Sequence, residues 1–318
     1  MLSKEDYKNK KIVYITNYTE KKSLKYSNDN LVVYKDNKIA SKVSLHITFC
    51  VVFIGDLTIT SYLIRKLVSH GVSVLFLNKN LKQYAVINSK SEGNYILRQS
   101  QYLMTEQKQL ELSKFVLANK IKNQASLLTY YKKPNNLSLE LKQSLKNAKN
   151  FNDLLGLEGS YASSYFKSIF TEYGWYKRSP MEKNDFINLL MDVGYTLTFN
   201  YIDFLLSIFG FDTYKGFYHR LFFQRKSLVC DVQEPFRVIV DKAIVKAINL
   251  KIYDAKDFKV KQSVCMFKDY KASEKYMDFF IKEIFLHKMD FYAYVSGLYK
   301  FYMYSQKYKF PVFNLKKH

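Results

Sequence analysis

The sequence has few cysteines, and their placement excludes two kinds of site. Only 3 cysteines occur in 318 residues, at Cys50, Cys230 and Cys265, and no two of them have CxxC spacing. An odd number of widely separated cysteines argues against a disulfide framework and against a zinc cluster built on thiolates. We therefore expect a protein of the reducing cytoplasm.

Long apolar runs are also absent. Residues 1–17 contain neither the apolar segment nor the small-residue cleavage site of a signal peptide, and the polar residues Asn200 and Asp203 interrupt one of the most apolar stretches. A membrane-spanning helix needs about 20 predominantly apolar residues in a row. The sequence therefore predicts an unexported protein that does not span a membrane.

Acidic residues are scarce relative to basic ones. The chain has 50 Lys and Arg against 28 Asp and Glu, which gives a formal net charge of +22. Such an excess favours a polyanionic partner, either nucleic acid or an anionic membrane surface, and charge alone does not choose between them. Because 48% of the residues are hydrophobic, the chain can still bury a substantial core in one large domain or two ordinary ones.

The hydrophobic pattern of residues 1–92 indicates a β-rich domain. Asp36-Asn37 is placed as a hairpin turn, and residues 58–71 have helical spacing and end at Gly71, where a C-cap glycine is expected. Short β-branched and aromatic runs, separated by polar turns, predict strands within 11–17, 31–40, 46–55, 73–78 and 83–87.

From residue 93 onward, the pattern changes to long helical periods with few breakers. We expect helices at 97–130, 137–149, 157–172, 183–209, 236–250 and 273–304. The predicted fold class is therefore α+β. A small N-terminal β-rich domain, residues 1–92, precedes a larger all-α domain, residues 93–318.

Glu158 is a first candidate for chemistry. It lies in LLGLEGSYASSYF, between Gly156 and Gly159, at the expected start of a helix and beside apolar residues. A glutamate in the first turn of a helix also interacts favourably with the helix dipole. Taken alone, Glu158 is explained equally well as a first-turn residue of a helix and as a catalytic residue.

His219 and two carboxylates form a second candidate segment. His219 follows a glycine-bounded turn and precedes Asp231 and Glu234. D-x-x-E followed by Pro235 and an apolar run also matches a capping-box-like helix start. If these side chains converge on Glu158, however, two carboxylates and an imidazole can hold Mg²⁺ or Mn²⁺ and leave positions open for a phosphate and a nucleophile. Such a site suits phosphodiester transfer.

Basic residues near these segments are candidates for DNA contact, because Lys and Arg contacts to phosphate supply sequence-independent affinity. We expect this role for Lys177, Arg178, Arg220, Arg225, Lys226 and Arg237. The remaining histidines have simpler explanations than metal binding. His46 alternates with apolar residues in an expected strand, and His70 ends an expected helix.

Three segments together match a set of known signatures in order and spacing. GLEGSYASSYF is similar to G-x-E-G-x-x-A-x-x-Y-F, GFYH to GFLH, and SLVCDVQEPFR to S-L-x-x-D-x-x-E-P-F-R. These signatures are typical of the CRISPR-associated spacer-acquisition integrases, which this chain resembles over nearly its whole length. Tyr218 departs from the usual Leu, but the three ligand positions are intact.

This resemblance implies an activity and the residues that carry it. It implies that Glu158, His219 and Glu234 ligate Mg²⁺ or Mn²⁺ and that Asp231 is an auxiliary catalytic carboxylate. It implies insertion of short DNA duplexes into a CRISPR array, by metal-dependent transesterification in which a 3′-hydroxyl attacks a repeat phosphodiester. Two alternatives stay open: a metal-dependent endonuclease acting on branched or single-stranded DNA, and a non-catalytic DNA-binding subunit.

The resemblance also implies partners. These are double-stranded DNA, as prespacer and as CRISPR repeat, and a second copy of the chain, with the N-terminal domain used for homodimerisation. A small ferredoxin-like companion, Cas-two, is a further expected partner.

Overall fold

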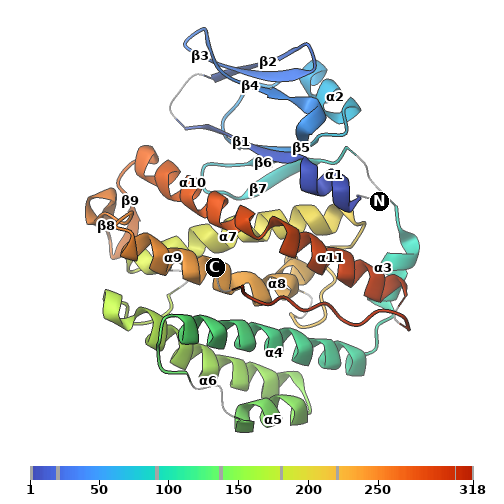
Figure 1. Cartoon of the computed structure of the whole chain (residues 1–318), viewed down its shortest axis with the longest axis vertical. Coiled ribbons are helices and arrows are strands. Elements are labelled where there is room, and N and C mark those ends of the chain that lie inside the picture. Colours follow the sequence, from blue (N-terminus) through green and yellow to red (C-terminus); the bar gives the residue numbers. More distant parts are fainter. Residues whose placement is uncertain are drawn as a thin grey trace. The chain divides into compact units, whose positions relative to one another are not determined.

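The computed structural model describes residues 3–18, 22–89, 93–135, 139–179, 182–219, 222–304 and 306–316 (Figure 1). The chain divides into two compact units. One comprises Met1–Asn94 with Ser207–Gly210, and the other comprises Tyr95–Leu206 with Phe211–His318. The first is rich in strands and the second is mostly helical, so the predicted α+β class is confirmed.

The N-terminal unit contains two sheets. The first has the order β1-β5-β6-β7 and consists of β1 (Lys11–Asn17), β5 (Thr48–Gly55), β6 (Ser73–Leu77) and β7 (Gln83–Ile87). The second is antiparallel and consists of β2 (Lys22–Ser27), β3 (Asn30–Lys35) and β4 (Lys38–Ser44). Strand β5 pairs in parallel with both β1 and β6, so a crossover must join β5 to β6. Helix α2 (Ser61–Ser69) lies in that crossover, and a short helix, α1 (Lys4–Asn9), precedes β1.

The core of this unit is formed by both sheets and α2. Alternate residues of β5, including Val51 and Phe53, are buried together with Val33 of β3 and Leu63 and Leu67 of α2. This arrangement follows from the period-2 pattern of the strands and the period-3.6 pattern of the helix, each of which places apolar side chains on one face.

Most local predictions for this region are confirmed. The predicted runs coincide with β1, β3, β5, β6 and β7 to within a few residues, and Asp36 and Asn37 form the hairpin turn, with φ of 50° and 61°. Only the start of β4 was predicted, because the run at 31–40 ends before residues 41–44 of that strand. Gly71 follows α2 with φ of 74°, as a C-cap glycine does. Helix α1 and strand β2 were not predicted. Strand β2 does alternate between inward and exposed residues, but only Leu24 and Tyr26 of its inward residues are apolar, so its sequence is too polar to stand out as a strand.

The C-terminal unit is built from helices. They are α3 (Tyr95–Tyr102), α4 (Glu106–Tyr130), α5 (Leu139–Asn147), α6 (Phe151–Phe170), α7 (Phe186–Ile208), α8 (Ser227–Gln233), α9 (Arg237–Asn249), α10 (Tyr270–Leu286) and α11 (Lys288–Met303). A hairpin of β8 (Phe258–Lys261) and β9 (Val264–Phe267) also belongs to this unit. The prediction of an all-α domain is therefore corrected by one short hairpin.

Several predicted helix boundaries are wrong for identifiable reasons. The expected helix at 97–130 is two helices, because Thr105 caps α4 by accepting a hydrogen bond from the Lys108 amide. Helix α6 begins earlier than expected, at Phe151, because Asn150 and Asp153 form a capping box. Glu158 therefore lies inside this helix and not in its first turn.

Helix α4 is central to the helical unit. It packs against α5, α6, α8 and α9, and it lies beside α6 in Figure 1. Asn119 of α4 exchanges two hydrogen bonds with the Phe313 backbone, donating at 2.6 Å and accepting at 2.9 Å, and Asn123 accepts from the Leu315 amide at 2.9 Å. Asn123 also donates to the Pro235 carbonyl at 3.3 Å, which ties the 3-10 helix η3 (Glu234–Phe236) to α4.

Helix α7 is largely buried but carries polar side chains, among them Asn200 and Asp203. Asp203 accepts a hydrogen bond from the Lys226 ammonium at 2.7 Å, so this buried carboxylate has a cationic partner. Among the described residues, no helix combines the length and the apolarity that a membrane crossing requires.

Gly194 of α7 lies close to side chains of α9 and α10. A Cβ atom at this position would lie 2.4 Å from Val240 Cγ1 and 3.2 Å from Phe280 Cε1. We expect Gly194→Ala to lower the free energy of unfolding by about 1–3 kcal/mol, because overpacking outweighs the helix preference of alanine. Denaturant unfolding of the purified protein measures this change.

The matched control is Gly159→Ala in α6, where the added Cβ would meet nothing within 4 Å. It should leave stability unchanged or raise it by up to about 1 kcal/mol. Equal stability of the two variants would contradict the close approach of α7 and α9.

Candidate active site

Two of the candidate carboxylates meet around a lysine. Lys120 of α4 places its Nζ 2.5 Å from Glu158 Oε1 and 2.7 Å from Glu234 Oε2. Glu158 comes from α6 and Glu234 begins η3, so three elements contribute to this cluster. The side chains of Lys120 and Glu234 are 8% and 2% exposed, and that of Glu158 is 18% exposed. The structure therefore brings Glu158 and Glu234 together at the edge of the buried interior.

His219 is held by Asp231. The fully buried Asp231 carboxylate accepts backbone hydrogen bonds from Phe217 at 2.6 Å, Tyr218 at 3.0 Å and His219 at 2.8 Å. It also lies 2.7 Å from His219 Nδ1. Because an ionised carboxylate only accepts, Nδ1 carries the proton, and in a neutral ring Nε2 keeps its lone pair. Asp231 thus has the geometry of a residue that positions His219.

The second ring nitrogen of His219, Nε2, lies near the carboxylate cluster. His219 Nε2 lies 4.0 Å from Glu234 Oε1. The structure therefore brings Glu158, Glu234 and His219 to one place, with Asp231 behind the imidazole.

Gly216 allows the loop before His219 to close on Asp231. A Cβ atom at this position would lie 2.6 Å from Asp231 Oδ2 and 2.8 Å from the backbone carbon of Ser227. Both neighbours are fixed, since Asp231 is hydrogen-bonded three times to this loop and Ser227 starts α8. Any larger residue would push the loop away, so the glycine-bounded turn is a requirement of this geometry.

Charges alternate through the cluster. Arg237 Nη2 lies 2.9 Å from Glu234 Oε1, so Glu234 contacts two cations. Burial alone would raise the pKa of Glu234, but Arg237 and Lys120 lower it to about 2. Burial would lower the pKa of Lys120, but Glu234 and Glu158 raise it above its usual value. Glu234 is therefore an anion and Lys120 a cation at neutral pH.

The donor set fits a hard divalent cation. Two carboxylates and an imidazole with a free Nε2 are ligands suited to Mn²⁺ or Mg²⁺. The Lys120 ammonium between the carboxylates shows that positive charge is accommodated there. In this structure, however, the Lys120 ammonium bridges the two carboxylates. A metal ligated by both Glu158 and Glu234 therefore has to displace Lys120 from between them.

Two residues of the cluster were not predicted. The Tyr218 hydroxyl donates a hydrogen bond to Glu158 Oε2, and burial together with the charge of Glu158 raises the pKa of Tyr218, so it stays a donor. In the sequence, Tyr218 was only a departure from the family signature. Lys120 could have been noticed from its position in the sequence, because it lies on the buried face of α4 together with Leu117 and Asn123. A lysine on such a face needs a buried counter-charge.

The candidate DNA contacts differ in their surroundings. Lys177 and Arg225 are exposed, although Arg225 also has a side-chain hydrogen bond with Cys230. Arg220 lies outside the described residues. For these three positions, DNA contact stays a prediction.

The other three basic candidates have protein partners. Arg178 donates to Asn188 Oδ1 at 2.8 Å, Lys226 donates to Asp203 at 2.7 Å, and Arg237 belongs to the charge cluster described above. Each of them therefore has a role within the fold that does not depend on DNA. Their contact with DNA also stays a prediction.

Comparison with known proteins decides the family. The family described as CRISPR associated protein Cas1 matches residues 13–280. This chain belongs to the Cas1 family. The CRISPR-associated endonuclease Cas1 1 of Thermodesulfovibrio yellowstonii is 29% identical over 225 residues, which cover 65% of this chain and 71% of that protein. The resemblance inferred from three short motifs is thereby confirmed.

Solved structures share the fold of this Cas1-family chain. A casposase bound to integration product is 22% identical with a TM-score of 0.77, and the match covers 97% of this chain and 96% of that one. A chain of a Cas6-RT-Cas1–Cas2 complex is 22% identical with a TM-score of 0.75, covering 97% of this chain and 36% of that one. At these identities the likeness concerns the fold alone.

The orienting role of Asp231 gives a testable prediction. In Asp231→Asn, the amide NH₂ replaces one acceptor oxygen, so the loop amides and His219 Nδ1 lose part of their shared acceptor. We expect Mn²⁺ affinity to fall about 10–100-fold, which is typical when the partner of a ligating histidine is changed. Isothermal titration calorimetry measures the loss.

The control for this change is Asp269→Asn. Asp269 is the N-cap of α10 and accepts a hydrogen bond from the Ala272 amide, a role that Asn fills equally well. Equal Mn²⁺ affinity of the two variants would contradict the role of Asp231.

A neighbouring carboxylate, Asp241 of α9, is fully buried. It accepts hydrogen bonds from Tyr165 at 2.7 Å and Tyr195 at 2.6 Å, and the Arg237 guanidinium lies 5.1 Å from the Tyr195 ring centroid. Burial raises the pKa of Asp241 to about 6, although the two tyrosine hydroxyls and Arg237 act in the opposite direction. This network connects the interior of the helical unit to Arg237.

The raised pKa of Asp241 predicts a pH dependence of stability. Between its ordinary pKa of 3.8 and about 6, Asp241 is protonated in the folded protein and ionised in the unfolded chain. Its stabilising contribution is therefore complete below about pH 4 and is lost as the pH rises to about 6, with a slope near 1.4 kcal/mol per pH unit. Urea unfolding across this window should show a shallower decline with pH for Asp241→Asn, and parallel profiles would contradict the shift.

Proposed function

We propose that this Cas1-family protein is an integrase of CRISPR adaptation. It inserts short DNA duplexes into the CRISPR array by transesterification of a 3′-hydroxyl onto a repeat phosphodiester, in a metal-dependent reaction. The observation that carries this proposal is the convergence of Glu158, His219 and Glu234, which come from separate family motifs. The fold shared with a casposase bound to integration product supports it.

Each residue of the cluster has a proposed role. Glu158, Glu234 and His219 Nε2 would hold Mg²⁺ or Mn²⁺, which when bound supplies a Lewis acid for the phosphate and favours ionisation of the attacking hydroxyl. Asp231 keeps the proton on His219 Nδ1, which leaves Nε2 free. Arg237 keeps Glu234 ionised.

Lys120 has a proposed second role in the reaction. Once displaced from the carboxylates, its ammonium lies at the edge of the site, where it can neutralise a phosphate oxygen. Metal binding would make the cluster more positive, because a divalent ion takes the place of a singly charged ammonium, and this favours an anionic phosphate at the site.

The proposed partners are DNA, a second copy of the chain and a small companion protein. The net charge of +22 and the exposed Lys177 and Arg225 favour DNA as both prespacer and repeat. The related chain in the Cas6-RT-Cas1–Cas2 complex is accompanied by Cas2, which supports the same type of companion here. Homodimerisation through the N-terminal unit and a cytoplasmic location stay predictions.

A second candidate function is DNA hydrolysis at the same centre. Water and a DNA 3′-hydroxyl can use the same ligands and the same ion, and the relative from Thermodesulfovibrio yellowstonii is named an endonuclease. A non-catalytic DNA-binding subunit would need neither the metal nor an oriented imidazole.

Strand transfer separates these functions. A labelled duplex with a free 3′-hydroxyl is incubated with a supercoiled plasmid carrying the repeat, with Mn²⁺ or Mg²⁺ and with or without Cas2. We expect covalent joining of label to plasmid that EDTA abolishes and that Glu158→Gln lowers by more than about 100-fold, because a directly acting charged group is lost. Binding of the duplex should change little, since phosphate contacts are distributed over many residues.

The control is Glu172→Gln, which removes a carboxylate from an exposed ion pair with Lys133 and should leave joining unchanged. Metal-dependent nicking without joining would favour the endonuclease. Binding without either reaction would favour the non-catalytic subunit.

A further inference from the structure

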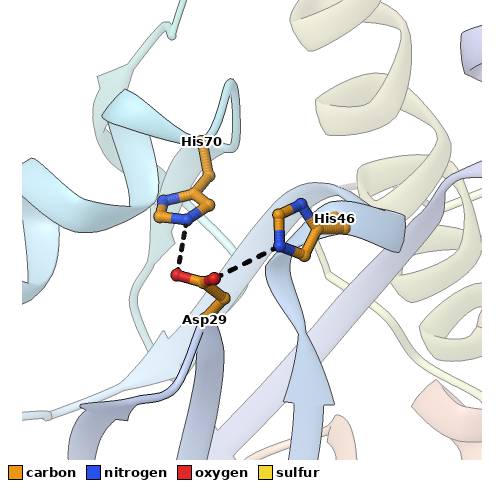
Figure 2. A group of neighbouring side chains, drawn as sticks. All are labelled: Asp29, His46 and His70. Atoms are coloured by element: carbon orange, nitrogen blue, oxygen red, sulfur yellow. Dashed lines mark hydrogen bonds and ion pairs between the residues drawn. The ribbon is translucent and has the colours of Figure 1, made fainter.

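The N-terminal unit holds a second group of metal-ligand side chains. Among the described residues, Asp29, His46 and His70 are the one group of at least three His, Cys, Asp or Glu residues whose ligand atoms all lie within 4.8 Å of one another. Figure 2 shows both imidazole rings directed at the Asp29 carboxylate. Asp29 lies in the turn between β2 and β3, His46 in the 3-10 helix η1 (Leu45–Ile47), and His70 at the C-cap of α2.

The surroundings of His46 and His70 differ from those expected from the sequence, which placed His46 in a strand and His70 at a helix end. His46 was expected within a strand, but it lies in η1, just before β5, so the alternation of the strand does not place its ring. His70 ends α2 as expected, yet its ring turns toward Asp29, which is far away in the sequence. The sequence could not show this, because the hairpin turn and the helix end meet only in the folded unit.

The hydrogen bonds of His70 fix its tautomer. His70 Nδ1 lies 2.8 Å from the Lys66 carbonyl oxygen, which only accepts, so Nδ1 carries the proton. His70 Nε2 lies 2.9 Å from Asp29 Oδ1, an oxygen that also accepts the Tyr26 hydroxyl. In a neutral ring, the Nε2 lone pair would face a carboxylate oxygen. The contact is favourable only if the ring carries a second proton or if one cation is bound to both atoms.

The hydrogen bond from Nδ1 to a carbonyl is the arrangement that metal-ligating histidines use. A backbone carbonyl that holds Nδ1–H orients the ring and directs the Nε2 lone pair at the ion. His46 supplies a second Nε2, 3.4 Å from Asp29 Oδ2, and its ring centroid is 5.6 Å from that of His70. A distance of 3.4 Å makes a poor hydrogen bond, but it suits two ligands of one ion.

The backbone holds the ligands in place without a metal. The Asp29 carbonyl accepts a hydrogen bond from the Leu45 amide at 2.8 Å, which ties the β2–β3 turn to the segment that carries His46. Asp29 itself adopts φ of 55° in this turn. The ligands therefore come from the same fixed region of the N-terminal unit, while the exposed His46 side chain leaves one side of the group open to water.

We propose that Asp29, His46 and His70 bind a divalent transition-metal ion of the Zn²⁺ class. Two imidazoles and one carboxylate provide three ligands, and water completes the tetrahedral coordination that Zn²⁺ adopts. Nitrogen ligands favour such an ion over Mg²⁺, so this site and the catalytic cluster select different metals. The ion joins the β2–β3 turn, η1 and the end of α2, and it stabilises the unit by binding only the folded state.

The test is Zn²⁺ binding by the full chain after removal of metals with a chelator. Competition with a chromophoric chelator gives the affinity, and Co²⁺ substitution reports tetrahedral nitrogen and oxygen ligation by its visible absorption. We expect saturable Zn²⁺ binding, part of which excess Mg²⁺ does not displace and which depends on His46 and His70. We also expect Zn²⁺ to raise the melting temperature.

Variants assign the ion to this group. His46→Ala changes an exposed side chain and should fold normally, and it should lower Zn²⁺ affinity by at least about tenfold. His70→Gln should do the same, whereas Glu172→Gln, which changes an exposed carboxylate outside both sites, should bind Zn²⁺ like the unaltered protein.

Two results would overturn the proposal. Absence of saturable Zn²⁺ binding to the unaltered protein would leave Asp29 and His70 as an ion pair only. Binding that Glu158→Gln abolishes and His46→Ala preserves would place the ion in the catalytic cluster. The first result would leave the proposed strand transfer untouched, and the second would support a metal site in the catalytic cluster. Failure of the Zn²⁺ proposal is therefore distinguishable from failure of the proposed function.

Discussion

The Lys120 ammonium lies between Glu158 and Glu234, and the positions of α4, α6 and η3 at the site depend on this contact. Burying these charges is costly, and removing one partner from a buried ion pair typically destabilises a protein by about 3–5 kcal/mol, because the remaining charge is left unpaired. Arg237 extends the cluster by pairing with the other oxygen of Glu234. The helical unit is therefore built around an anionic pair that always requires a cation.

This requirement links folding to the proposed chemistry. A divalent ion that takes the place of Lys120 satisfies the same carboxylates, and the imidazole is already oriented by Asp231. Glycine at position 216 permits the loop to approach Asp231 closely enough for this. The site thus needs little rearrangement apart from the lysine side chain, which is long and flexible enough to move.

The sequence predicted much of the fold and only part of the site. Alternating apolar residues located most strands, and short motifs located Glu158, His219 and Glu234. The same patterns missed β2, which buries one side chain, and they read Glu158 as a helix start because glycines flank it. Contacts between distant segments leave no local pattern, so the bridging position of Lys120 and the meeting of His70 with Asp29 required the structure.

The most direct test of the central claim is a crystal structure with Mn²⁺, whose anomalous scattering locates the ion. We predict a peak ligated by Glu158, His219 and Glu234, with the Lys120 ammonium moved away from between the carboxylates. A crystal in which Mn²⁺ binds elsewhere while Lys120 still bridges Glu158 and Glu234 would contradict it.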